Sequence, residues 1–259
     1  MTFFSIPPWT IAISMFGLVS LAAAEPTQVD VRVISKGAKF VGTSMGGAEI
    51  TIQDAETGQV LARGKTAGST GDTDKIMREQ QTRHSPVSTK DAAVFHADLD
   101  LEAPRRVRVT ARGPLAQLQS ATTVSVTQWV IPGKDITGGD ALTLEMPGFV
   151  VDVLSPPAHK KLSQQKEADD VEIRANVTMM CGCPIAPDGL WDANQFEVAA
   201  IVHRDGTKLE EVPLKYSGET SQFSGLVDAI EPGAYVVTVY AFDPANGNTG
   251  LDRTSFIVP

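Results

Sequence analysis

Residues 233 to 243 read GAYVVTVYAFD, and the run NGNTG follows at residues 246 to 250. Apolar side chains occupy every second position of the first run, which is the period of a β-strand with one buried face. The Asn and Gly residues of the second run predict a turn, so that a last strand, Thr254 to Val258, completes a hairpin. The side chains expected to point inward are those of Tyr235, Val237, Val239 and Ala241.

The same alternation recurs along the chain, broken by Gly, Pro, Asn and Asp. This pattern is typical of short strands joined by tight turns. Helical periodicity is nearly absent, and only Asp74 to Thr82 is expected to hold a helical turn. We therefore predict an all-β protein. The other predicted strands are Val29 to Ile34, Ala48 to Gln53, Gln59 to Gly64, Val94 to Leu99, Arg106 to Ala111, Ala121 to Val130, Phe149 to Leu154, Val171 to Met179, Phe196 to His203, Glu210 to Tyr216 and Gly225 to Ala229.

The first residues predict export. Trp9 to Leu21 are almost wholly apolar, and three alanines precede Glu25, which is typical of a signal peptide at residues 1–24 that is cleaved after Ala24. An uncleaved anchor is the alternative, but the apolar run is short for a bilayer span of about 20 residues. No later run is apolar and long enough to span a membrane. We expect a periplasmic or secreted protein.

The charge disfavours nucleic acid as a partner. The chain has 259 residues and a formal net charge of −9, and it has no Lys/Arg run interleaved with aromatic residues. An acidic surface repels phosphate backbones. The expected partner is instead a periplasmic or cell-envelope protein.

The length predicts two domains in tandem after the signal peptide. Turn-forming residues at 138–140 and at Pro147-Gly148 place the boundary near residue 147. We expect one β-sandwich at residues 25–146 and a second at 147–259. A long polar loop at residues 67–91 interrupts the first, and loops of this length are usually functional or mobile.

The hairpin at residues 47–62, GAEITIQDAETGQVLA, followed by Gly64-Lys65-Thr66, resembles the start of a carboxypeptidase-regulatory-like, transthyretin-like β-sandwich. The alternation points Ile50 and Ile52 toward a core, and the turn lies between Asp54 and Gly58. The last 30 or so residues are similar to the final hairpin of bacterial immunoglobulin-like domains. This second resemblance implies that Tyr235 is a corner tyrosine, whose hydroxyl bonds back to the backbone.

The sulfur atoms are concentrated in one run. The two cysteines of the chain, Cys181 and Cys183, follow Met179 and Met180 directly. Alternation in the preceding strand, extended past its end, puts Met179, Cys181 and Cys183 on one face and Met180 on the other. Gly182 and Pro184 indicate that the strand ends there, in a loop at one end of the sandwich.

Three hypotheses fit this run. Thiolate and thioether sulfurs favour Cu(I), so Met179, Met180, Cys181 and Cys183 are candidate copper ligands, and a thiolate pair also suits Zn(II) with help from a histidine. The second hypothesis is a disulfide. Two residues along an extended strand separate Cα atoms by about 6.6 Å, and a bend at Gly182 would bring them within bonding range. The third is two small buried side chains that bind nothing.

No catalytic motif assembles. The chain has no nucleophile elbow, phosphate loop, dinucleotide fingerprint or HExxH motif. We therefore expect a non-catalytic binding protein that holds or delivers Cu(I) through the sulfur run. The alternative is a structural or protein-interaction module with a Cys181–Cys183 disulfide.

Overall fold

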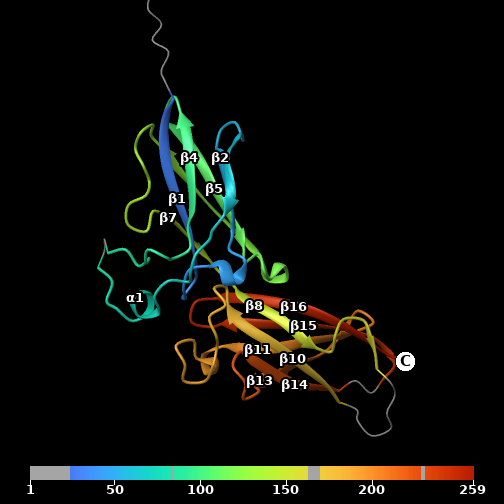
Figure 1. The fold of residues 1–259 in the computed structure, drawn as a ribbon. Helices are drawn as coiled ribbons and strands as arrows, with labels where there is room; N and C mark the ends of the chain where they lie inside the picture. Colours follow the sequence, from blue (N-terminus) through green and yellow to red (C-terminus); the bar gives the residue numbers. More distant parts are fainter. Residues whose placement is uncertain (1–23, 83–84, 163–169, 229–230) are drawn as a thin grey trace, which may run out of the picture.

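The computed structural model describes residues 24–82, 85–162, 170–228 and 231–259. The chain forms two β-sandwiches in tandem, and the strands of the second run across the end of the first (Figure 1). The predicted all-β fold is confirmed. The predicted signal peptide lies outside the described residues, apart from Ala24.

The first sandwich consists of a three-stranded sheet, β4-β1-β7, packed against a four-stranded sheet, β3-β2-β5-β6. Its core is formed by the inward-facing side chains of both sheets, including Val31, Ile50 and Val109. The strands are β1 (Glu25–Ser35), β2 (Glu49–Asp54), β3 (Val60–Lys65), β4 (Phe95–Leu101), β5 (Arg105–Gly113), β6 (Thr122–Val130) and β7 (Leu142–Met146). Short 3₁₀ turns occur at η1 (Thr43–Met45) and η2 (Leu118–Ser120).

The β7 strand was not predicted from the sequence. It pairs in parallel with β1, with Val31 opposite Leu142 and Ser35 opposite Met146. The first strand of the sandwich therefore lies beside its last, and the pairing closes the three-stranded sheet.

The predicted hairpin forms as β2 and β3, with Ile50 and Ile52 buried in the core. Asp54 ends β2 and accepts hydrogen bonds from the backbone N–H groups of Glu56 and Thr57 at 2.9 and 2.8 Å. Gly58 then takes a left-handed φ of 76°, which favours glycine and completes the turn. The N–H of Thr57, followed by that of Glu56, lowers the pKa of Asp54 to about 2.

Because this carboxylate has a lowered pKa in the folded chain, it makes the fold sensitive to acid. Its contribution to stability is complete above the unfolded pKa, near 3.8, and is lost as the pH falls toward about 2. We expect Asp54→Asn to lose less stability than the wild type between pH 5 and pH 2.5, measured from urea midpoints at both values. The matched control is Asp98→Asn, an exposed carboxylate on β4. An unchanged acid sensitivity in Asp54→Asn would contradict this assignment.

The polar segment at residues 67–91 is tied to the first sandwich along much of its length. Ser69 forms a bridge to Ala92, and the side chain of Asp140 accepts hydrogen bonds from the backbone of Val87 and Ser88 at 2.9 and 2.8 Å. The expected helical turn forms as α1 (Thr73–Met77), which is shorter than the predicted range. Arg83 and His84 of this segment lie outside the described residues.

The second sandwich has the strand arrangement of an immunoglobulin-like domain. One sheet has the order β13-β14-β10-β8, and the other has the order β12-β11-β15-β16-β9. In immunoglobulin lettering, these correspond to sheets with strands A, B and E and with strands C, F and G. The strands are β8 (Phe149–Ser155), β9 (Lys160–Lys161), β10 (Asp170–Met179), β11 (Glu197–Arg204), β12 (Thr207–Pro213), β13 (Lys215–Tyr216), β14 (Gln222–Asp228), β15 (Gly233–Asp243) and β16 (Asn248–Val258), with a 3₁₀ turn at η3 (Ala193–Gln195).

Several predicted boundaries in this sandwich were wrong, including the start of β14, which lies at Gln222 and not at Gly225. The single strand expected at Glu210 to Tyr216 is divided after Pro213, and its two parts, β12 and β13, belong to opposite sheets. A proline lacks the N–H that a sheet interior requires, which explains a strand end at this position. The last strand begins at Asn248, inside the run expected to form only a turn.

The corner tyrosine is confirmed. Tyr235, at the start of β15, is 1% exposed, and its hydroxyl donates a hydrogen bond of 2.9 Å to the backbone carbonyl of Glu231. Its ring stacks on that of Phe256 with the centroids 4.8 Å apart. The other predicted inward side chains of β15 are also buried: Val237, Val239 and Ala241.

Candidate functional site

The sulfur run begins with Met179, the last residue of β10, at the end of the second sandwich that meets the first. Cys181 and Cys183 form a disulfide, with their Cα atoms 5.3 Å apart. Both are nearly inaccessible to solvent, at 2% and 4% exposure. The bond is therefore part of the interior of the protein.

The chain reverses at Gly182, which brings the cysteines into bonding range. Gly182 has a left-handed φ of 74° and donates from its N–H to the carbonyl of Met179 at 2.8 Å. The N–H of Met179 in turn donates to the carbonyl of Cys183 at 3.1 Å. A glycine suits this backbone conformation, because a side chain would be strained there.

The predicted division of the sulfur run between two faces is present in the structure. Met179, Cys181 and Cys183 pack in the core of the second sandwich. Met180 is fully buried in the core of the first. The run thus places side chains in two separate cores, and at most three of its sulfur atoms share one of them.

Hydrogen bonds from distant parts of the sequence join the two sandwiches around this run. Trp191, in the loop that follows the cysteines, donates from Nε1 to the carbonyl of Gly37 at 3.0 Å. The Oγ of Ser120 accepts from the N–H of Val151 at 3.1 Å. We call this region the junction, and it comprises Gly37, Met45, Gln119, Ser120, Gly148, Val151, Met180, Cys181, Gly182, Cys183, Trp191 and Asn248.

A buried asparagine fixes the link between the sandwiches. Asn248, 1% exposed, accepts from the N–H of Gly148 at 2.6 Å and donates from Nδ2 to the Gly148 carbonyl at 2.9 Å. Both backbone groups of this buried glycine are therefore satisfied by one side chain. Gly148 immediately precedes β8. The two hydrogen bonds from the Asn248 side chain therefore hold the chain where it passes from one sandwich to the other.

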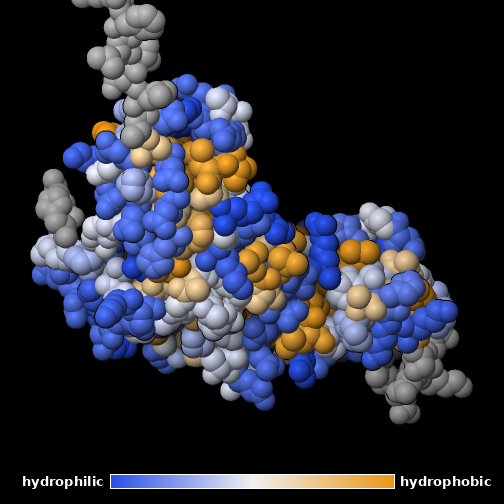
Figure 2. All heavy atoms as spheres, turned by 45° about the horizontal axis from the view of Figure 1, so that its top comes forward, coloured by the Kyte–Doolittle hydropathy of each residue, from blue (hydrophilic) through white to orange (hydrophobic). Residues whose placement is uncertain are grey.

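Glycines allow close packing across the junction. A Cβ added at Gly182 would lie 2.6 Å from the sulfur of Met45, and one added at Gly148 would lie 3.0 Å from that of Met180. These distances are shorter than ordinary van der Waals contacts, so a side chain at either position would displace the neighbouring methionine, and the positive φ of both glycines would strain it. Apolar atoms also reach the surface along the region where the sandwiches meet (Figure 2).

The copper hypothesis stays a prediction. In the structure both cysteine sulfurs are bonded to each other, so Cu(I) ligation by them requires prior reduction of a buried disulfide. In the part of the chain that the structure describes, no three His, Cys, Asp or Glu side chains gather as a metal site would require. Met179 shares the core of the second sandwich with the pair.

A thiol and copper titration tests the two states of this pair. The oxidised chain is expected to show no reactive thiol and to take up no Cu(I), since its sulfurs are bonded and buried. The copper hypothesis predicts about one equivalent bound after reduction, and none in Cys181→Ser/Cys183→Ser. The double variant should lose about 1.6 kcal/mol of stability, from the chain-entropy expression for a three-residue loop. No Cu(I) uptake by the reduced wild type would contradict copper binding.

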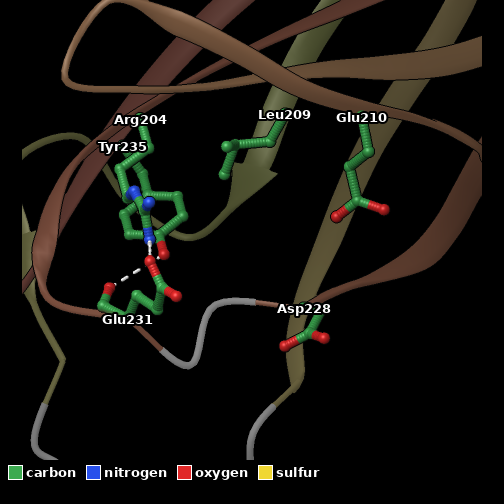
Figure 3. A pocket seen from close by; sticks show the side chains of 6 residues that line it. All are labelled: Arg204, Leu209, Glu210, Asp228, Glu231 and Tyr235. Carbon is green, nitrogen blue, oxygen red and sulfur yellow. Dashed lines mark hydrogen bonds and ion pairs between the residues drawn. The ribbon is translucent and has the colours of Figure 1, made fainter.

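A separate open pocket of about 380 Å³ is lined in part by the corner tyrosine (Figure 3). Arg204 lies over Tyr235 and donates a hydrogen bond to the carboxylate of Glu231, and this bond raises the pKa of Arg204. Glu210 and Asp228 face the opposite side of the pocket. Arg204 is already paired with Glu231, so the remaining charged side chains in the pocket lining, Glu210 and Asp228, are acidic.

Sequence reasoning found the sulfur run but not the junction around it. Several contacts that define the junction join residues 100 or more positions apart, such as Gly148 to Asn248 and Gly37 to Trp191. The available signal was the strand register, which placed Met180 on the face opposite the cysteines. It did not indicate that this opposite face meets another domain.

No family model and no curated protein matches the chain. Solved structures with some similarity include an engineered protein, 18% identical over 47% of this chain, with a TM-score of 0.32. The fibronectin(III)-like modules of CbhA from Clostridium thermocellum are 11% identical, over 90% of this chain and 93% of theirs, with a TM-score of 0.28. The titin domains Z1Z2, solved in complex with telethonin, are 12% identical over 92% of this chain and 98% of theirs, with a TM-score of 0.26. The match spans 22% of the engineered protein's length.

Among the described residues, no helix has the length and apolar character of a membrane span.

Proposed function

We propose that this chain is an exported, non-catalytic interaction module in which the two sandwiches act as one rigid unit toward a periplasmic or cell-envelope protein. The observation that carries the proposal is the junction, where the disulfide run contributes to both cores. A fixed orientation keeps loops and sheet faces of the two sandwiches in a constant relation, which reduces the ordering cost of binding a partner. The apolar run at Trp9 to Leu21 supports export.

The first sandwich is proposed to be of the transthyretin-like kind. Its support is the hairpin β2–β3, which carries the residues of the resemblance, together with the two sheets β4-β1-β7 and β3-β2-β5-β6. This assignment concerns architecture, since one sandwich fold hosts many unrelated activities.

Affinity capture from envelope extract tests the interaction function. The mature chain, beginning at Glu25, is immobilised beside an unrelated protein of similar net charge. Enrichment of the same protein by this chain in independent extracts is expected, and that protein is then titrated in purified form. If this chain captures no protein more strongly than the unrelated control protein does, the proposed interaction function is wrong.

The rigid-unit part of the proposal needs a variant that loosens the junction and leaves both cores intact. Gln119→Ala/Ser120→Ala removes the side-chain hydrogen bonds to the backbone of Val151. A partner that contacts both sandwiches should bind this variant several-fold more weakly. The control is Gln28→Ala, an exposed change at the opposite end of β1 from Gly37. Equal affinity of the partner for the two variants would show that binding does not depend on the relative orientation of the sandwiches.

A further inference from the structure

The outward face of the sheet β3-β2-β5-β6 is positively charged, although the protein as a whole is acidic. Alternate residues of β5 and β3 point outward from the core and are exposed. The cations on this face are Arg63, Lys65, Arg106, Arg108 and Arg112, and the cross-strand pairing adds one carboxylate, Glu49. We call these five cations, with the outward residues between them, the cationic face.

The five cations are not neutralised by the rest of the protein. Within the residues that the structure describes, the ion pairs involve other side chains, and none includes a member of the cationic face. Exposed guanidinium groups that lack a partner are suited to bind carboxylates, because their planar N–H donors match the two oxygens. A local charge opposite in sign to the net charge of −9 also directs an anionic partner to this face rather than elsewhere.

The strand at the edge of this face, β6, lies near β7 of the facing sheet but does not pair with it. β6 ends the sheet, and among the described residues no other strand pairs with its outer side. Its sequence, TTVSVTQWV, has no charged residue, whereas the other edge strands of the first sandwich carry charges: β3, β4 and β7. Free edges usually carry charges or prolines that prevent pairing with another chain. A nine-residue edge without either is suited to accept an extra strand.

The side chains on both faces of β6 are compatible with an added strand. Its inward residues Val124 and Val126 are only partly buried against the core, so an added strand could cover them with apolar side chains. Its outward residues are mostly short, and Thr123 and Thr127 lie opposite Arg112 and Arg108 of β5. Acidic side chains on an added strand could therefore reach Arg108 and Arg112 across small residues, and Arg106 past the exposed Trp129.

From these observations we infer that β6 accepts an extended acidic segment of a partner protein as an additional antiparallel or parallel strand. Apolar residues of that segment would face the core, and alternating acidic residues would contact the arginines of β5. The inference rests on the proposed interaction function and names the chemistry of its partner. A second copy of this chain fits less well, because pairing of β6 with β6 would join two cationic faces into one.

The probe is a fluorescein-labelled decapeptide of alternating Val and Glu, titrated against the intact chain by fluorescence anisotropy. Two control peptides share its length: alternating Val and Lys, with the opposite charge, and alternating Pro and Glu, with the same charge but with every second backbone N–H removed and every second φ fixed near −65°, which disfavours a β-strand. The Val–Glu peptide is expected to bind at least about tenfold more tightly than either control. Hydrogen exchange of the β6 amides should slow when it binds.

A charge-matched pair of variants assigns the contacts. Arg106→Gln/Arg108→Gln/Arg112→Gln should weaken Val–Glu binding about tenfold, from the loss of three exposed ion pairs. Lys160→Gln/Lys161→Gln/Lys215→Gln changes the net charge equally on exposed residues of the second sandwich and should leave affinity within about twofold. Thermal melts of both variants verify that they fold.

Several results would overturn the inference. The inference is wrong if the Val–Glu peptide shows no saturable binding, or if the Pro–Glu peptide binds as tightly as the Val–Glu peptide. It is also wrong if the two triple variants weaken Val–Glu binding equally. Arginine-dependent binding to phosphatidylglycerol vesicles without β6 protection by the peptide would assign the face to a membrane. A dimer in sedimentation equilibrium that protects β6 and that the peptide does not dissociate would assign the edge to a second copy. If a captured envelope protein binds the arginine variant unchanged, the proposed function stands and this surface is wrong.

Discussion

Met180→Ala is expected to destabilise the first sandwich by about 2–5 kcal/mol, although the residue follows the second sandwich's strand β10. Met180 is fully buried in the core of the first sandwich, so its truncation leaves a cavity there. Hydrogen exchange should become faster in β2 and β5, which line that core. Urea denaturation measures the total loss of stability.

Met179→Ala is the matched control, because the neighbouring methionine packs in the other core. It should cost a similar amount and raise exchange in the second sandwich instead. Met180→Leu, which conserves volume, should cost less than about 1.5 kcal/mol. If Met180→Ala raised exchange only in the second sandwich, the assignment of this side chain to the first core would be wrong.

Tyr235→Ala is expected to cost about 3–5 kcal/mol, since a large buried ring is removed from the second core. The loss includes the stacking of Tyr235 on Phe256 and the hydroxyl bond to the carbonyl of Glu231. Equilibrium denaturation of the second sandwich, followed by hydrogen exchange in β15 and β16, measures it.

Tyr235→Phe separates the hydroxyl from the ring. It keeps the stacking and removes one hydrogen bond, so we expect a loss of about 1 kcal/mol. Phe256→Leu, which keeps the hydroxyl bond and removes the stacked ring, should fall between the two Tyr235 variants. A Tyr235→Phe variant as unstable as Tyr235→Ala would mean that the corner bond, not the ring, provides most of the stability.

Most strands could be predicted from alternation because the two faces of each sandwich strand differ in burial. β15 and β2 are examples, since their buried residues are those that alternation selects. β7 was missed because Leu142 to Met146 is short and follows a turn-rich run, and its pairing partner is more than 100 residues away. The division of β12 from β13 depends on which sheet each part joins, a tertiary choice that strand propensity does not contain.

The candidate site could be predicted in part. The strand exit, the bend at Gly182 and the division of sulfur side chains between two faces all follow from local sequence. The close approach of Met45 to Gly182 does not, because it depends on how one sandwich sits on the other. Long-range contacts of this kind have no local pattern from which they could be inferred.

The parallel pairing of β1 with β7 has a consequence for how the nascent chain matures. Synthesis proceeds from the N-terminus, so one edge of β1 stays unpaired until β7, which begins at Leu142, has emerged. The core of the first sandwich stays incomplete until Met180 has emerged as well. During that interval a growing chain of more than 100 residues exposes an unpaired strand edge and apolar side chains, which invites aggregation. The first sandwich is thus begun at Glu25 but finished only after β10 of the second sandwich has been made, and a holdase that covers β1 would act mainly during this interval.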